Sequence, residues 1–241
     1  MATSETLSMP LLAVQGIEKG FGGLKVLRGI DFSVYPGEIC GMIGPNGCGK
    51  STLFDIITGY QKPEAGSILF DGQPVARFLP HEIARRGLIR TFQLTRVFPQ
   101  LTVAENLLVF SRVNDDEGEA RAKQLLDFVH LLALADREAS TLSYGQLKLL
   151  ELAQVLMHKP KMLLLDEPMA GINPGFIREI VQHLRHLRDE GMTILLVEHN
   201  LPIVADLCDR IAVVSGGTVL LNDRADVVVN DPMVKEVFLG G

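Results

Sequence analysis

The sequence lacks any long hydrophobic run. Its apolar stretches are short, as in Met162–Leu165, Thr193–Val197 and Ile211–Val214, whereas a helix that crosses a bilayer needs about 18 or more consecutive apolar residues. The first nine residues carry no Lys or Arg and no long apolar stretch, so we expect no secretory signal. These absences predict a cytoplasmic protein that reaches a membrane only when a partner holds it there.

Cysteine and basic charge are also scarce. The three cysteines, Cys40, Cys48 and Cys208, have a spacing that matches neither a metal site nor a disulfide framework. We therefore expect reduced thiols, as in cytosolic proteins. The net charge is −6, and because nucleic-acid binding requires a basic face, the composition predicts no nucleic-acid partner.

The remaining composition indicates a globular α/β protein. The chain has 241 residues and is 47% hydrophobic, which permits one large domain or two small ones with a sizeable core. Alternating apolar residues over 11–34 predict antiparallel strands that end at the Pro36-Gly37 turn. An apolar strand over 38–43 then leads into a glycine-rich loop, followed by a helix over 51–58.

The rest of the chain divides into a helical middle and a final α/β part. The patterns predict strands over 67–71, 88–92, 162–165 and 193–197 and a hairpin over 211–222, and helices over 80–86, 102–111, 120–134, 144–157, 174–190 and 232–238. The acidic, polar segment 114–119 is predicted to be a loop, and Asn173 to cap the helix that follows it. This order predicts one α/β domain with an inserted helical part over about 94–158.

The run Gly44–Ser51 (G-P-N-G-C-G-K-S) fits the phosphate-loop pattern G-x-x-x-x-G-K-[ST]. Glycines let backbone amides approach phosphate oxygens, and the next helix turns its free N–H groups and positive end toward the same anion. Lys50 supplies charge to the β and γ phosphates, and Ser51 offers a hydroxyl to Mg²⁺. A chance match would occur in roughly one chain in a hundred, and the strand before and helix after the loop make it rarer. The loop predicts ATP and Mg²⁺ as cofactors.

Two further segments are weaker signals when taken alone. Asp166-Glu167 follows an apolar strand, where one carboxylate can hold Mg²⁺ and the next can polarise a water, but surface Asp-Glu pairs are common. Leu142–Gln146 (L-S-Y-G-Q) precedes a helix, so Ser143 is either an ordinary helix cap or part of a second anion site. A single phosphate loop does not need a second anion site, whereas a dimer with nucleotide at its interface does.

Taken together, these segments resemble the ATP-binding cassette ATPases over nearly the whole chain. The elements follow the family's order: Phe21, the phosphate loop at 44–52, Gln93 in R-T-F-Q, the signature at 142–146, Asp166-Glu167, and His199 in V-E-H-N. The resemblance implies a P-loop NTPase (RecA-like) core with an antiparallel β subdomain and an inserted α-helical subdomain. It implies a single domain over 1–241, in which 10–92 and 159–241 form the nucleotide-binding core and 93–158 form the helical subdomain.

The resemblance also implies a role for each matching residue. Glu167 is implied as the general base, His199 as the γ-phosphate contact that orients the water, and Gln93 as a contact to Mg²⁺ and water. Mg²⁺ ligands are implied at Ser51, Gln93 and Asp166. Nucleotide contacts are implied at Phe21, Gly44, Pro45, Asn46, Gly47, Cys48, Gly49, Lys50, Ser51 and Thr52, and, across a dimer, at Ser143, Tyr144, Gly145 and Gln146. Without the family match, Phe21 reads equally well as a core residue, and Gln93 and His199 as ordinary surface or core residues.

Two positions depart from the family pattern. The signature usually has Gly where Tyr144 stands, and the segment after Glu167-Pro168 usually reads Ser-Ala-Leu-Asp, whereas 170–173 here read Ala-Gly-Ile-Asn. These departures, together with R-T-F-Q and the tail V-K-E-V-F-L-G, resemble the ATPase subunits of branched-chain amino-acid importers. Importers of urea or short amides share much of this pattern and remain an alternative.

The implied partners are a second ATPase subunit, identical or paralogous, two transmembrane permease subunits, and indirectly a periplasmic or extracellular solute-binding protein. The chain would then lie on the inner face of the cell membrane. Three rival functions are weaker. A DNA-repair or chromosome ATPase would need a coiled-coil insertion or a basic surface, a translation-associated cassette protein carries two cassettes, and a small-molecule kinase leaves Ser143–Gln146 and His199 unexplained.

Overall fold

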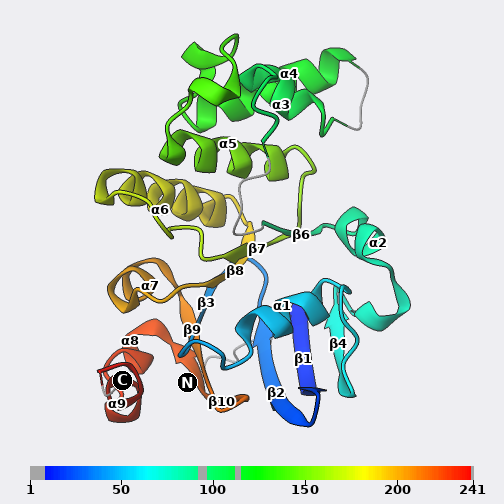
Figure 1. Ribbon diagram of the computed structural model, residues 1–241, viewed down its shortest axis with the longest axis vertical. Coiled ribbons are helices and arrows are strands. Elements are labelled where there is room, and N and C mark those ends of the chain that lie inside the picture. Colours follow the sequence, from blue (N-terminus) through cyan, green and yellow to red (C-terminus); the bar gives the residue numbers. More distant parts are fainter. Residues whose placement is uncertain (1–8, 92–96, 112–114, 240–241) are drawn as a thin grey trace, which may run out of the picture.

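The computed structural model describes residues 9–91, 97–111 and 115–239. The described chain contains a four-stranded sheet with the order β2-β1-β4-β5 and a six-stranded sheet with the order β10-β9-β3-β8-β7-β6. Helices α3, α4 and α5 gather at one end of the long axis, and β10 and α9 lie toward the other (Figure 1).

The smaller sheet is antiparallel, as the alternation over 11–34 predicts. β1 (Leu12–Phe21) pairs with β2 (Leu24–Val34) on one side and with β4 (Ala65–Phe70) on the other. β4 turns through Asp71-Gly72 into β5 (Gln73–Pro74). Both turn residues have left-handed backbone, with φ of 50° and 71°, which is the conformation that an Asp-Gly hairpin turn requires. The predicted Asp-Gly turn is confirmed.

The larger sheet is parallel except for its last strand. Its parallel strands are β3 (Ile39–Ile43), β6 (Leu88–Arg90), β7 (Met162–Asp166), β8 (Thr193–Val197) and β9 (Arg210–Ser215). β10 (Thr218–Arg224) pairs antiparallel with β9 and closes the predicted hairpin. Every residue of β3, β7 and β8 is buried, as expected for strands covered on both faces.

Side chains of the central strands alternate between two cores. On β7, Leu163 and Leu165 face one core, while Met162 and Leu164 face the other, which follows the two-residue period of a strand. The second core lies between the two sheets and includes Phe54 of α1 (Lys50–Ile57). The first core is covered by α6 (Pro174–Asp189), α7 (Leu201–Leu207) and α8 (Ala225–Val228).

The first core also extends into the inserted helical part. α3 (Val103–Leu108), α4 (Asp115–Phe128) and α5 (Tyr144–Leu156) contact one another, and their buried side chains belong to the same cluster as those of β3, β7 and β8. A shared core is what a single domain with an insertion requires. The division at residues 93 and 158 stays a proposal.

The remaining helical elements are short. They are the helices α2 (Pro80–Arg85) and α9 (Pro232–Leu239) and the 3₁₀ turns η1 (Val75–Arg77), η2 (Leu132–Leu134) and η3 (Ala139–Thr141). None of the helices in the described ranges is both long enough and apolar enough to cross a bilayer.

The prediction of a loop over 114–119 is wrong from residue 115 onward, where the structure describes the chain. α4 begins at Asp115, and its first residues are acidic. Acidic side chains in the first turn are stabilised by the positive end of the helix, so the charge that suggested a loop favours the helix start. The same helix ends earlier than predicted, because His130 has a left-handed backbone with φ of 58°. Helices α7 and α8 were not predicted at all.

Asn173 caps α6 as predicted. Its Oδ1 accepts hydrogen bonds from the backbone N–H groups of Gly175 at 3.0 Å and Phe176 at 3.2 Å. Asn173→Ala should lower the free energy of unfolding by about 1 kcal/mol, because both amides lose their acceptor. Asn173→Asp keeps the acceptor and adds a negative charge at the positive helix end, so its stability should equal or exceed that of the native chain. Urea denaturation measures both, and an Ala variant as stable as the native chain would contradict this account.

Candidate functional site

The loop Gly44–Ser51 connects β3 to α1, and close packing requires glycine at two of its positions. A Cβ on Gly44 would lie 2.1 Å from the carbonyl oxygen of Val214 in β9. Gly49 has φ of 105°, and a Cβ there would lie 2.4 Å from Cδ2 of Leu27 in β2. The loop therefore packs closely against β9 of one sheet and β2 of the other, and these contacts hold its backbone in place without a ligand.

The N-terminus of α1 has no side chain capping it. Gly49 is its N-cap and makes no side-chain hydrogen bond, whereas α3, α5, α6 and α7 are capped by Thr102, Ser143, Asn173 and Asn200 respectively. Uncapped first-turn N–H groups and the positive helix end are the features that bind an anion. Within the described chain, α1 thus has the helix start expected of a phosphate site.

Lys50 closes the loop on itself. Its Nζ donates to the carbonyl oxygens of Gly44 at 2.7 Å and Pro45 at 3.0 Å and lies 3.7 Å from Sγ of Cys48. Lys50 is only 6% exposed. The ammonium is therefore held at the loop by neutral acceptors, and a phosphate oxygen arriving there would offer it a stronger, charge-assisted partner.

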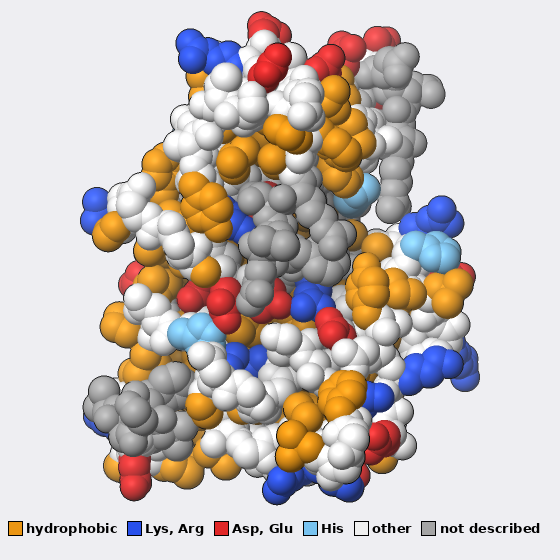
Figure 2. Space-filling view, in the orientation of Figure 1, with side chains coloured by type: hydrophobic (Ala, Val, Ile, Leu, Met, Phe, Trp, Pro, Cys, Tyr) orange, Lys and Arg blue, Asp and Glu red, His pale blue; other side chains and the backbone are white. Residues whose placement is uncertain are grey.

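The register of the parallel sheet brings the other predicted residues to the same edge. Val197, the last residue of β8, lies opposite Met42 of β3 and opposite Asp166 of β7. The phosphate loop, Asp166-Glu167 and His199 all follow these strand ends within two residues. Acidic side chains with a histidine beside them gather over β7 and β8 in the middle of the face shown in Figure 2.

Asp166 ends β7 as a buried carboxylate with one oxygen still unpaired. Its Oδ2 accepts from an Nη of Arg90 at 2.8 Å, and Oδ1 is buried without a hydrogen-bond partner among the described residues. The other Nη of Arg90 lies 2.6 Å from Asp55 Oδ1 in α1. This chain of charges ties the helix after the phosphate loop to the end of β7. Arg90 was not predicted, although its place at a strand end on this edge was the available signal.

Glu167 and His199 meet beside Asp166. Glu167 has a left-handed backbone with φ of 49°, an unfavourable conformation for a residue with a Cβ and one that is typical of functional sites. Its Oε1 lies 2.5 Å from Nε2 of His199. Both side chains are partly exposed, so the pair is open to a ligand and to water.

Glu198 holds the two segments of this pair together. It is buried, and burial raises the pKa of its carboxyl above the usual range. Its Oε1 accepts from the N–H of Met169 at 3.0 Å, and its Oε2 from the N–H of His199 at 3.3 Å. A role for Glu198 was not predicted, because V-E-H-N contains no pattern that separates this residue from an ordinary acidic neighbour.

The signature segment Leu142–Gln146 forms the start of α5. Ser143 Oγ accepts from the N–H of Gln146 at 3.4 Å, and Gln146 Oε1 accepts from the N–H of Ser143 at 2.9 Å, which is a capping box. A Cβ on Gly145 would lie 2.5 Å from the ring of Phe176 in α6. The cap reading of Ser143 is therefore correct for this chain, and any anion contact of Ser143 would be additional.

The two departures from the family pattern touch each other. Tyr144 donates from its hydroxyl to the carbonyl oxygen of Ala170 at 3.5 Å, and its ring lies against Gly171, where an added Cβ would be 3.5 Å away. Gly171 has φ of 73°. The large residue in the signature is thus accommodated by a glycine in the facing loop.

The structure does not bring the signature to the phosphate loop of the same chain. α5 lies well apart from α1 in Figure 1. Phe21 ends β1 and is 48% exposed, with Nζ of Lys19 5.3 Å from its ring centre, so the core alternative is wrong for Phe21. Gln93 lies outside the described residues.

Comparison with known proteins places these features in one family. The family model described as "ABC transporter" matches residues 27–170. The high-affinity branched-chain amino acid transport ATP-binding protein LivG of Escherichia coli is 40% identical, with 97% of this chain and 99% of LivG covered. The corresponding protein BraF of Pseudomonas aeruginosa is 36% identical, with 97% and 99% covered.

The solved structures agree with the sequence relatives. The ADP conformation of MJ1267, an ATP-binding cassette of an ABC transporter, superposes with a TM-score of 0.89 at 35% identity and covers 97% of this chain and 100% of MJ1267. A nucleotide-free ATP-binding cassette superposes with a TM-score of 0.86, also at 35% identity, over 97% of this chain and 100% of its own. The predicted P-loop α/β fold and the predicted family are confirmed: the chain belongs to the ABC transporter family and is one of its ATP-binding cassettes.

Proposed function

We propose that this chain hydrolyses ATP to power an importer of branched-chain or similarly hydrophobic amino acids, which pass through partner permeases. The main support for the proposal is the contact between Glu167 and His199, which lies on the same sheet edge at which the phosphate loop follows β3. The cargo assignment rests on the names of LivG and BraF, because cargo passes through the permeases and does not touch this chain.

ATP would bind with its phosphates on the loop Gly44–Ser51 and the uncapped start of α1. Lys50 would exchange its loop carbonyl partners for β- and γ-phosphate oxygens. Phe21 offers a half-exposed ring on which adenine can stack. Each contact uses a group that the fold has already positioned.

The residues at this edge also fit Mg²⁺. The ion prefers oxygen ligands in an octahedral shell that usually keeps several waters. The unpaired Oδ1 of Asp166 and the exposed hydroxyl residue Ser51 supply such oxygens, and Gln93 completes the proposed set. When bound, the ion neutralises charge on the β and γ phosphates.

Hydrolysis would proceed by attack of water on the γ-phosphorus. Glu167 accepts a proton from that water as the new P–O bond forms, and the bond to ADP breaks with its electron pair leaving on the ADP oxygen. His199 holds Glu167 through Nε2 and is in turn held by Glu198. The left-handed backbone of Glu167 sets the direction in which its side chain leaves the main chain.

A second cassette would complete the site. Ser143–Gln146 begin α5, which lies apart from α1 of its own chain (Figure 1), yet the capped helix start presents exposed Ser143 outward. In a two-fold dimer, each chain gives its phosphate loop to one nucleotide and its signature to the other. Closure around two ATP molecules and reopening after hydrolysis would then move the permeases.

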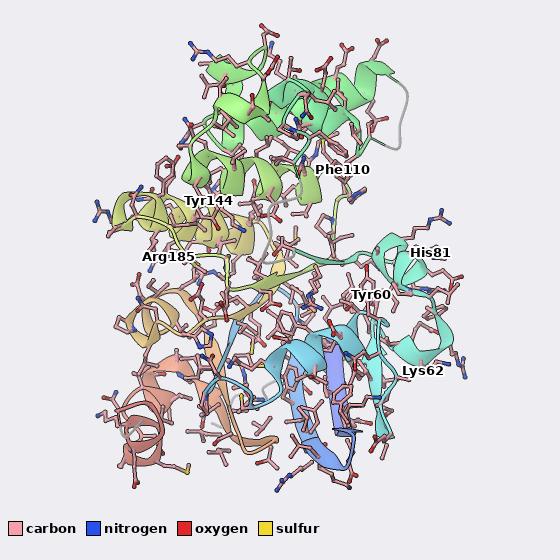
Figure 3. The ribbon with its side chains drawn as sticks, viewed as in Figure 1. Tyr60, Lys62, His81, Phe110, Tyr144 and Arg185 are labelled. Carbon is pink, nitrogen blue, oxygen red and sulfur yellow. The ribbon has the colours of Figure 1, made fainter. Side chains whose placement is uncertain are left out.

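An apolar groove between the helical part and the side formed by α2 and β6 suits a permease segment. It is lined by residues from both sides, including Tyr60, Ile83, Phe110 and Val155. Phe110 and Tyr60 flank it from opposite sides in Figure 3. Large exposed apolar patches on soluble proteins mark interaction sites, and this groove would hold the chain on the inner face of the membrane.

Glu167→Gln should bind ATP with nearly native affinity but hydrolyse it at least about 100-fold more slowly, because the base is lost while shape is kept. With ATP it should accumulate as a dimer, measured by light scattering during gel filtration. Glu190→Gln, a change at an exposed carboxylate at the end of α6, is the matched control and should turn over normally. Native turnover by Glu167→Gln would refute the assignment of the base.

Tyr60→Asp should prevent co-purification with co-expressed permease subunits, because a charge in the groove opposes burial of an apolar segment. Nucleotide binding should stay native. Val227→Asp changes another exposed apolar residue, on α8, and should co-purify as the native chain does. Co-purification of the Tyr60 variant at the native level would rule this groove out as the docking site.

A further inference from the structure

A cluster of His130, Glu179 and His183 lies away from the nucleotide edge, between the turn after α4 and helix α6. One ligand atom from each residue lies within 4.8 Å of the others. None of these residues contributes to the phosphate loop, the signature or the Asp166–His199 region. The His130 imidazole comes from the turn after α4, and the Glu179 carboxylate and the His183 imidazole come from α6, about fifty residues later in the sequence.

The helix geometry explains why the cluster forms. Glu179 and His183 are four residues apart on α6 and therefore share one face. Phe128, at the end of α4, packs edge-on against His183 with ring centres 4.8 Å apart. This contact brings the following turn, with His130, over the same face of α6.

His183 carries a buried nitrogen that forms no hydrogen bond within the part of the chain that the structure describes. The residue is 6% exposed, and its Nε2 has no hydrogen-bond partner among the described residues. Glu179 Oε1 lies 3.9 Å away, beyond hydrogen-bond range. Leaving a buried polar atom unpaired is unfavourable, and burial together with the nearby His130 lowers the pKa of His183.

His130 reaches the cluster at a cost to its backbone. Its φ of 58° is the left-handed conformation that follows a helix end and normally favours glycine. The side chain is 71% exposed, and its Nδ1 lies 3.2 Å from Glu179 Oε1. The site is therefore open to solvent on the His130 side and closed on the His183 side.

We propose that His130, Glu179 and His183 bind one divalent transition-metal ion of the Zn²⁺ class. Two imidazole nitrogens and a carboxylate oxygen form a ligand set that suits Zn²⁺ and its neighbours, with water in the fourth position. Ligand atoms about 2.0–2.2 Å from a tetrahedral ion lie roughly 3.4 Å apart. Glu179 Oε1 lies 3.2 Å from His130 Nδ1 and 3.9 Å from His183 Nε2, and these two distances bracket that separation. The exposed His130 ring supplies the small adjustment that closes the shell.

The ion would join the helical part to α6. The start of α6 holds the signature glycine, because Phe176 packs against Gly145. An ion that joins α6 to the turn after α4 would therefore hold α6 more rigidly against the signature, without contacting nucleotide.

The test is a Zn²⁺ titration of the full-length, chelator-stripped chain without nucleotide, read by competition with a chromophoric chelator. The native chain should bind one equivalent. His130→Ala and Glu179→Gln should each weaken that binding at least about tenfold, because loss even of an outer-shell partner costs that much. Co²⁺ should give visible d–d absorption in the native chain that both variants lose.

His186→Ala is the matched control. His186 lies one turn beyond His183 but pairs with Glu190 at 3.4 Å instead, so this variant should bind Zn²⁺ as the native chain does. Because His130 is exposed, its replacement leaves the core intact, which circular dichroism checks. The proposal is overturned if the native chain binds no Zn²⁺, or if binding survives unchanged in His130→Ala and Glu179→Gln, as it would for an ion held at Glu167 and His199.

Discussion

The register of the parallel sheet is the constraint on which the site depends. Val197 lies opposite both Met42 and Asp166, so the ends of β3, β7 and β8 form one edge. The phosphate loop, the two carboxylates and His199 follow from these ends within two residues. A one-residue slip of β7 would turn Leu163 and Leu165 toward the wrong core and move Asp166 off the edge. The same burial that stabilises the sheet therefore sets the geometry of the site.

Buried charge then links this edge to the loop. Arg90 joins Asp166 to Asp55, and Glu198 joins Met169 to His199. Charged groups this deeply buried are tolerated only when they are paired or hydrogen-bonded. Among the described residues, Oδ1 of Asp166 is buried without a partner, and the proposed Mg²⁺ would satisfy it.

Much of the fold and of the candidate site could be predicted from the sequence, because strong local patterns of residues indicate these features. The phosphate loop, the buried strands over 162–165 and 193–197 and the Asn173 cap follow from residue type and spacing alone. Arg90 and Glu198 could not be assigned in the same way, because their roles depend on partners that only the fold brings together. Arg90 binds Asp55 and Asp166, which are 35 and 76 residues away in the sequence. Glu198 links its neighbour His199 to Met169, which is 29 residues away from Glu198. The acidic start of α4 was misread because acidic residues fit both a solvated loop and a helix N-terminus.

The contact between Tyr144 and Gly171 shows a second limit of sequence reading. Taken separately, each residue is a departure from the family pattern, whereas in the fold one accommodates the other. In the proposed dimer, each single chain holds two half-sites, its phosphate loop and its signature.

Thiol cross-linking tests that claim most directly. Asn46 in the loop and Ser143 in the signature are both exposed, and a chain carrying Asn46→Cys, Ser143→Cys, Cys48→Ser and Glu167→Gln can be treated with a short bis-maleimide. With ATP, the account predicts a covalent dimer of twice 26.4 kDa, absent without ATP and absent from a chain that carries only one of the two introduced cysteines. A link formed within one chain, or no ATP-dependent dimer, would contradict it.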